Sequence, residues 1–348
     1  MNTQPSCRTC FFRPGGLPLP VRRARPRVPG RCSFTPVPFV FGVSFLRSLG
    51  VSFPRSLGVS FPRFLAIWFA LHSFLSLGFS PILFPGSGLR AQDLPAPHEI
   101  RGWDALLLPL GAGLSGYGLW LGERQEPLAP EDFRGLDPGD INVFDRPATK
   151  NWSPAWSRVS DVSAALVAGW AVTLAGYEGA RYLVDGNGSE ALVLATVFGE
   201  ATLLTLGVTA VVKPLVGRKR PFAYNDSFTP EERFRIGSSR PGEVSRSFFS
   251  GHTSSAFAAA AFSSALFEDF YGTDAASRLV WGSTLSLATL TAVARVKAGM
   301  HFPTDVVVGA LVGGAIGYLV PFAHRKEGPD GPPALLAPVH IGLRVPVG

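Results

Sequence analysis

The chain has 348 residues, of which 46% are hydrophobic and only 16% are charged. Its mean hydropathy of +0.23 is too high for an ordinary soluble protein and predicts membrane-spanning segments. The formal charge of +7 comes from residues 1–92, which hold 11 arginines and no acidic residue, whereas the remainder has 21 basic and 25 acidic residues. This distribution argues against a basic nucleic-acid-binding face, so we expect no nucleic-acid partner.

Residues 1–92 are predicted to be a disordered, low-complexity region with one signal-like apolar segment. Residues 1–35 are rich in proline, arginine and glycine and lack the period of a helix or strand. The apolar run of residues 64–78 follows arginines and precedes a small residue, as in a secretory signal; a first transmembrane helix is the rival interpretation. The three cysteines, Cys7, Cys10 and Cys32, lie in this region, and a single CxxC pair is weak evidence for a zinc or redox site.

From residue 103 onward, six apolar segments alternate with polar loops. Each is close to the roughly 20 residues that cross about 30 Å of hydrocarbon, so the sequence predicts an all-α polytopic membrane bundle of about six spans. A soluble helical bundle is the alternative, but the last segment has no polar face after Asp305. The six segments are 103–122, 159–181, 189–212, 253–271, 279–297 and 304–323.

These segments divide the chain into four parts. After residues 1–92, residues 93–158 hold the first apolar segment and a polar cap loop. Residues 159–323 form the helical bundle, and residues 324–348 are expected to be a flexible tail. Asp161 and Glu200 fall inside predicted spans, and we expect both to face the bundle interior because lipid does not solvate a carboxylate.

Three short polar stretches lie at the ends of the last four apolar segments. Consecutive helices alternate in direction, so the sequence predicts that all three stretches meet at one rim of the bundle. They are Lys213 to Arg220-Pro221, then Ser250-Gly251-His252, and then Arg295 with His301 and Asp305.

The residue types in these stretches suit a phosphate group. Lys213, Arg220 and Arg295 can neutralise its oxygens, and the forked donors of arginine match their geometry. Ser250 is expected to cap the fourth segment, so that backbone N–H groups at this helix start point toward an anion. Gly251 lets the backbone approach closely.

Two histidines can divide the work of phosphoryl transfer. His301 is expected to attack phosphorus, because Asp305 lies four residues on and can fix its tautomer by bonding one ring nitrogen. His252 has no carboxylate at a comparable spacing in the sequence, which suits it to general acid catalysis.

The pattern K-x6-RP, then SGH, then R-x5-H-x3-D resembles the type 2 phosphatidic acid phosphatase superfamily over about residues 160–323. That family also contains bacterial acid phosphatases, undecaprenyl-pyrophosphate phosphatases and vanadium haloperoxidases. The resemblance implies a helical bundle, with six spans in the membrane members, and, in the phosphatases, a reaction that needs no metal, so we expect no cofactor. Two positions depart from the family pattern: Phe249 stands where proline is usual, and Ala294 stands where serine is usual.

The resemblance also implies a role for each motif residue. The phosphate-binding residues would be Lys213, Arg220, Ser250, Gly251 and Arg295, with His252 as the acid, His301 as the nucleophile and Asp305 as the group that orients it.

The expected function is therefore that of a membrane phosphatase acting on a lipid phosphate or lipid pyrophosphate, of the phosphatidate or undecaprenyl-pyrophosphate type, through a phosphohistidine. Alternatives are a non-specific acid phosphatase, a vanadate-dependent haloperoxidase with His301 on vanadium, and a non-catalytic lipid-binding membrane protein. Arg240 and Arg246 hint weakly at a second phosphate in the substrate.

The expected location is a bacterial-type cell membrane, with the catalytic rim on the outer face as the family resemblance implies. A cleaved signal followed by six spans would place that rim in the cytoplasm instead. An N-terminus inside the cell, with residues 64–88 not crossing, would place it outside. Arg325 and Lys326 after the last segment favour a cytoplasmic C-terminus, which agrees with an outward rim.

Overall fold

The computed structural model describes residues 96–126, 128–239 and 242–326. The predictions for residues 1–92 and for most of the tail at 324–348 lie outside the described residues. Within them the fold is helical, and the β-type pairing is limited to one isolated bridge between His98 and Arg325. The predicted all-α fold is confirmed for this part of the chain.

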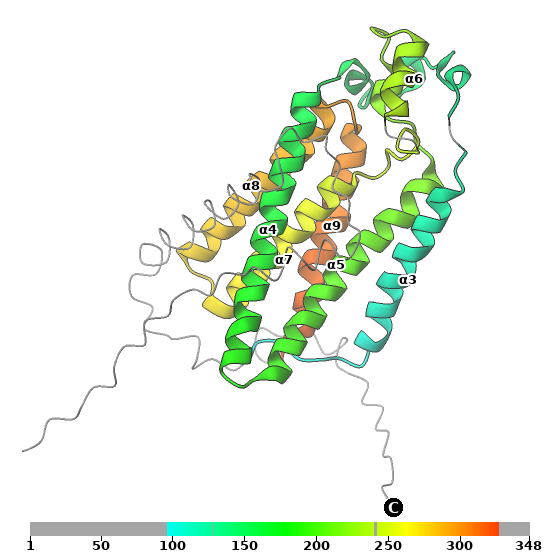
Figure 1. Cartoon of the computed structure of the whole chain (residues 1–348). Helices are drawn as coiled ribbons and strands as arrows, with labels where there is room; N and C mark the ends of the chain where they lie inside the picture. The colour runs from blue at the N-terminus through cyan, green and yellow to red at the C-terminus, as the bar shows by residue number, and fades with distance from the viewer. Residues whose placement is uncertain (1–95, 127, 240–241, 327–348) are drawn as a thin grey trace, which may run out of the picture. The chain divides into compact units, whose positions relative to one another are not determined.

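Six long helices coincide with the six predicted apolar segments. They run side by side, and short helices gather at one end in a cap that includes α6 (Figure 1). The long helices are α3 (Asp104–Glu123), α4 (Pro154–Val184), α5 (Gly188–Val216), α7 (Gly251–Tyr271), α8 (Ala275–Lys297) and α9 (Pro303–His324). The short ones are η3 (Pro130–Phe133), η4 (Pro138–Asp140), η5 (Arg146–Lys150), η6 (Pro221–Tyr224) and α6 (Pro230–Ser238).

Five of the long helices, α3, α4, α5, α8 and α9, are long and apolar enough to cross a membrane. They make this a multi-pass membrane protein. The sixth expected span, α7, is a 21-residue helix that does not reach the same apolarity. Its small and hydroxyl side chains are mostly buried, because α7 packs against α4, α5, α8 and α9 rather than against lipid. Ser264, for example, shares a buried hydrogen bond of 3.0 Å with Thr284 of α8.

Close packing of α7 on α9 depends on glycine. Gly309, Gly313 and Gly317 lie one turn apart on α9, and a Cβ atom at any of them would collide with a backbone carbonyl of α7 or of its N-cap residue Ser250. Small residues allow such close approach between membrane helices. The start of α7 is thereby held directly against the start of α9, where two of the three motifs lie.

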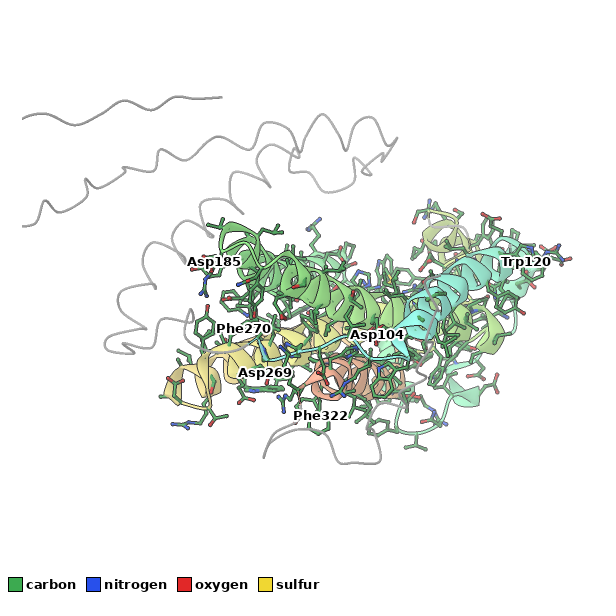
Figure 2. All side chains as sticks on the ribbon, turned by 90° about the horizontal axis from the view of Figure 1, so that it is seen from below. Asp104, Trp120, Asp185, Asp269, Phe270 and Phe322 are labelled. Carbon is green, nitrogen blue, oxygen red and sulfur yellow. The ribbon has the colours of Figure 1, made fainter. Side chains whose placement is uncertain are left out.

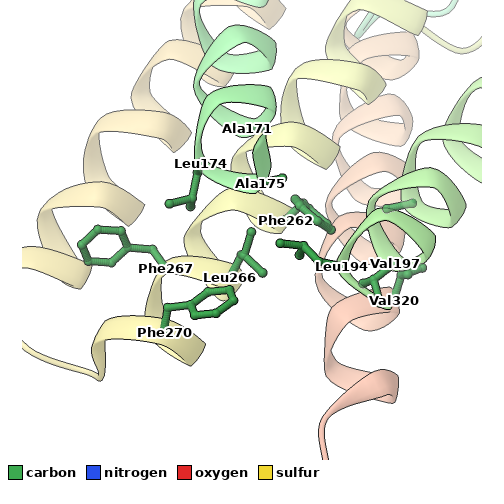
Figure 3. Close-up of a cluster of buried hydrophobic side chains, with 11 residues drawn as sticks. Ala171, Leu174, Ala175, Leu194, Val197, Phe262, Leu266, Phe267, Phe270 and Val320 are labelled. Atoms are coloured by element: carbon green, nitrogen blue, oxygen red, sulfur yellow. The ribbon is translucent and has the colours of Figure 1, made fainter. Parts of the chain in front are cut away.

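Apolar clusters hold the two ends of the bundle. In the half away from the cap, Leu174, Leu194, Phe262, Leu266 and Val320 converge from four helices (Figure 3). The cap has its own cluster, which joins the short helices to the loop between α8 and α9. Its buried members are Phe133, Phe222, Ala223, Val244, Ala298 and Met300.

Candidate active site

The three motifs meet at the capped end of the bundle. Gly251 of α7 lies against Lys213 of α5, since a Cβ at this glycine would be 3.3 Å from the lysine Cε. Arg220 donates to the Met300 carbonyl at 3.2 Å, and the Ser250 N–H donates to the Asp305 carbonyl at 3.0 Å. The structure therefore joins each motif to the other two by direct contact.

His301 is fully buried beneath this rim, in the loop between α8 and α9. Its Nδ1 lies 2.7 Å from the backbone carbonyl oxygen of Ser247, and its Nε2 has no hydrogen-bond partner. A proton on Nδ1, donated to that carbonyl, leaves the Nε2 lone pair free.

Burial lowers the pKa of His301 well below its usual value, and the positive charges of Arg220, Arg295, Lys213 and His252 lower it further. His301 is thus a neutral imidazole at neutral pH, with an unprotonated nitrogen among cations. This is the state that a nucleophile toward phosphorus requires.

Asp305 does not bond the His301 ring as the spacing led us to expect. Its Oδ2 lies 3.7 Å from Nδ1, which is too long for a hydrogen bond, and the Ser247 carbonyl takes the ring proton instead. The same Oδ2 accepts from the Ser247 hydroxyl at 2.5 Å and from the Phe302 N–H at 2.9 Å. Asp305 therefore positions His301 through Ser247 and the loop that carries the histidine.

His252 has a carboxylate partner that the sequence spacing concealed. Asp161 of α4 places its Oδ1 at 3.2 Å from His252 Nε2 and at 3.7 Å from an Arg295 nitrogen. Asp161 faces the bundle interior, as expected, and it does so at the catalytic rim. The His252 side chain is 44% exposed, in contrast to the enclosed His301.

The candidate phosphate-binding residues line the same region. Arg295 is almost fully buried and donates to the Ser160 hydroxyl at 3.3 Å. Lys213 donates to the Arg246 carbonyl at 3.3 Å. Ser250 is buried at the N-cap of α7, where its hydroxyl accepts from the Thr253 N–H at 3.4 Å, so it caps this helix as predicted.

Arg220 is held by a neighbouring carboxylate. Its guanidinium donates to the Glu243 side chain at 2.5 Å and to the Glu243 carbonyl at 2.6 Å. Burial alone would raise the pKa of Glu243, but the charges of Arg220, Lys213 and Arg246 outweigh burial and hold it below its usual value. A phosphate at Arg220 would compete with this ionised carboxylate.

Residues 194–329 match the family model described as the PAP2 superfamily. The similarity to the PAP2 superfamily is confined to this part of the chain, which is less than half of its length. The matched range contains all three motifs, which confirms the resemblance and supports a phosphatase-type activity in general. No match was found among curated proteins or among solved structures.

Four further residues support the PAP2 motifs and were not singled out by the sequence. Arg218 donates to Asp305 at 2.6 Å and to Asp145 of the cap loop at 2.8 Å, and its guanidinium lies 4.0 Å from the Phe302 ring centre. Asp145 in turn accepts from Thr304. Arg218 falls inside K-x6-RP, but a basic residue at a helix end more often marks a lipid head-group contact. Asp145, Thr304 and Ser247 are far apart in sequence and give no local signal.

The hint of a second phosphate site loses its support. The Arg246 guanidinium donates to the Gly122 carbonyl and, at 2.9 Å, to the Gln125 side chain, so it ties the cap to α3. Arg240 lies outside the described residues. Among the described residues, a close group of side chains with metal-ligand spacing lies at the opposite end of the bundle, on α3, α5 and α9.

Replacing Arg218 with methionine removes both of its ion pairs while keeping much of its volume. Asp145 and Asp305 are fully buried, so we expect a loss of about 3 kcal/mol at neutral pH, read as a lower melting temperature. Burial alone would raise the pKa of Asp145, but hydrogen bonds from Arg218, Thr304 and Asn142 hold it below its usual value of 3.8. A carboxyl group whose pKa is lowered by folding stabilises the folded protein at pH values above its usual pKa. This contribution is lost as the pH falls through the lowered pKa of the folded state. The difference in melting temperature between wild type and variant should therefore become smaller below about pH 3.8.

The matched control is Arg134→Met, which removes an exposed pair with Glu231 at 3.5 Å and should change the melting temperature little. Equal effects of the two substitutions across the pH range would contradict the role assigned to Arg218.

Proposed function

We propose that this protein is a membrane phosphatase that hydrolyses a lipid phosphate or lipid pyrophosphate through a phosphohistidine intermediate. The observation that carries the proposal is the buried, unpartnered Nε2 of His301 next to the charges of Lys213, Arg220 and Arg295. A buried nitrogen without a hydrogen-bond partner destabilises the folded protein, so its presence indicates a functional role. A phosphoryl group at this point would meet a nucleophile and three cations together.

In the first step, the His301 Nε2 lone pair attacks phosphorus. The nitrogen–phosphorus bond forms while the bond to the leaving oxygen breaks, and that oxygen takes a proton from His252. The charge on the transferring oxygens is stabilised by the three cations. In the second step, a water molecule attacks phosphorus and gives a proton to His252, and the electron pair of the nitrogen–phosphorus bond returns to His301.

The groups around each histidine suit these roles. His301 becomes positively charged as it attacks, and the Asp305 carboxylate at 3.7 Å stabilises that charge while the Ser247 carbonyl keeps the ring in place. Burial lowers the pKa of His252, and the carboxylate of Asp161 opposes this by favouring the protonated form that a general acid needs. The exposed side of His252 gives the leaving group a route to the solvent and head-group region.

The position of the site supports a lipid substrate. The motifs are at the ends of long apolar helices, so a lipid can keep its chains in the bilayer while its phosphate reaches the rim. Within this proposal, phosphatidate and undecaprenyl pyrophosphate represent the mono- and diphosphate classes.

Phosphate release from short-chain phosphatidate or a short polyprenyl pyrophosphate in detergent tests the function. We expect His301→Ala to lower kcat by about 10³-fold or more, because removing a nucleophile leaves only binding and electrostatic catalysis. Rapid acid-free quenching of labelled substrate should trap phosphate on wild type and not on His301→Ala. Full activity of a folded His301→Ala protein would rule out this nucleophile, and hydrolysis of soluble phosphate esters alone would point to a non-specific acid phosphatase.

The substitution Asp161→Asn tests whether Asp161 assists protonation of the leaving group or the nucleophilic attack on phosphorus. We expect kcat on an alkyl phosphate lipid to fall about 10²-fold, because an alkoxide leaving group needs a proton. The rate with p-nitrophenyl phosphate, whose leaving group is stable without a proton, should change far less. An equal loss on both substrates would mean that Asp161 acts on attack or on phosphate binding through Arg295.

We further propose that the protein resides in a bacterial-type cell membrane with the catalytic rim facing outward. The family resemblance and the basic residues Arg325 and Lys326 after α9 support this orientation, whereas the many basic residues of the rim favour the reverse.

Labelling of single cysteines tests the orientation, with the three native cysteines replaced by serine. A membrane-impermeant maleimide on spheroplasts should label Asp137→Cys in the cap, and should label Asp185→Cys, exposed at the α4–α5 turn, only after permeabilisation. The reverse pattern would place the rim in the cytoplasm.

A further inference from the structure

Three ligand-type side chains meet inside the bundle, away from the catalytic rim. Asp104 begins α3, His324 ends α9, and Glu200 lies in the first half of α5. All three are buried, with side-chain exposures of 6%, 1% and 0%. Figure 2 views the bundle from this end and labels Asp104.

The three side chains have the spacing of ligands around one ion. His324 Nε2 lies 3.0 Å from Asp104 Oδ1 and 3.3 Å from Glu200 Oε2, and one ligand atom from each residue lies within 4.8 Å of the others. Ligands bound at about 2.0–2.2 Å to a central Zn²⁺ must lie within about 4.4 Å of one another, so only small shifts would complete a site.

The backbone orients His324 as it does in metal sites. Its Nδ1 lies 2.7 Å from the Val320 carbonyl oxygen and its Nε2 faces both carboxylates, so a proton on Nδ1 donated to that carbonyl would leave Nε2 free to bind an ion. In metal-binding histidines, a hydrogen bond of this kind, donated by the ring nitrogen that does not bind the metal, fixes the tautomer. Asp104 is held in turn, since its other oxygen accepts the Arg101 N–H at 2.8 Å.

Glu200 is the independent observation that points to a ligand. Both of its carboxylate oxygens are buried without a hydrogen-bond partner. Among the described residues its ion-pair partner is His324, and neither lysine nor arginine pairs with it. A carboxylate so placed is costly without a cation, above all in the interior of a membrane protein.

We propose that Asp104, Glu200 and His324 bind a divalent transition-metal ion of the Zn²⁺ type. One imidazole and two carboxylates suit Zn²⁺ better than the all-oxygen preference of Ca²⁺ or Mg²⁺. With a neutral histidine, the two carboxylates carry two negative charges, which one divalent ion cancels. The site joins α3, α5 and α9, so its role is to hold these helices together and not to take part in phosphoryl transfer.

The metal content of the full chain, purified in detergent from Zn²⁺-supplemented cells without chelators, tests this proposal. The three cysteines are replaced by serine so that the CxxC pair binds nothing. We expect about one Zn²⁺ per chain, and loss of the bound ion in Glu200→Gln, because removal of a charged ligand weakens metal binding strongly. The matched control is Glu178→Gln, which alters another buried carboxylate, one on α4 that pairs with Arg181 and with Tyr271 of α7; this variant should keep the ion.

Melting temperature supplies a second readout. EDTA should lower it in the parent and in Glu178→Gln, and Zn²⁺ should restore it, whereas Glu200→Gln should respond to neither. His301→Ala should retain the ion, which separates this site from the catalytic histidines.

A parent chain without bound metal, whose melting temperature ignores both EDTA and Zn²⁺, would overturn the proposal and leave a cluster neutralised by protons. Retention of the ion in Glu200→Gln would overturn it equally. If Glu200→Gln does not fold, Asp104→Asn takes its place. Binding of Co²⁺ to the unsubstituted triad, read from its visible absorption, needs no variant, and a spectrum without tetrahedral bands would count against the site.

Discussion

The Asp305 carboxyl group is the point on which the catalytic rim depends. Its side chain accepts from Ser247, from the Phe302 N–H and from Arg218, and its backbone carbonyl accepts from Ser250. These bonds tie the start of α9 to the start of α7 and to the segment that follows α5. Packing of apolar helices in lipid is weakly directional, so polar bonds at helix ends fix how the motifs face each other.

Charge balance is the second constraint on the rim. Lys213, Arg220 and Arg295 would repel one another strongly if they were alone in a protected site. Glu243 forms an ion pair with Arg220, and Asp161 lies beside Arg295. The partners differ in exposure: the Glu243 side chain is 44% exposed, so a phosphate can displace it into solvent, whereas the two carboxylates that hold Arg218 are fully buried. Exchange with substrate is therefore easiest at Arg220, and the support around Asp305 stays fixed.

Features that depend on local sequence were predicted, whereas contacts between residues of different helices were missed. The long helices and the eight motif residues follow from apolar period, helix ends and fixed spacing, all of which operate within one segment. The expected His301–Asp305 bond failed because spacing places two residues near each other but does not say which of several acceptors takes the ring proton. Asp161 was predicted to face inward, but its pairing with His252 requires α4 to pack against α7, which no single segment encodes. Likewise, the apolar run of α7 predicted a long helix but not its burial among the other helices of the bundle.

Two helices carry residues of both the rim and the cluster at the other end. α5 holds Glu200 and Lys213, and α9 holds Asp305 and His324. With 22 residues, α9 is about 33 Å long at 1.5 Å per residue, so Asp305 and His324 near its two ends make no direct contact. A rigid helix does transmit a displacement along its own axis from one end to the other. Fixing α3, α5 and α9 together at one end limits how far Lys213 and Asp305 can slide past each other at the other end, so a bound ion would affect the stability of the bundle far more than the chemistry at His301.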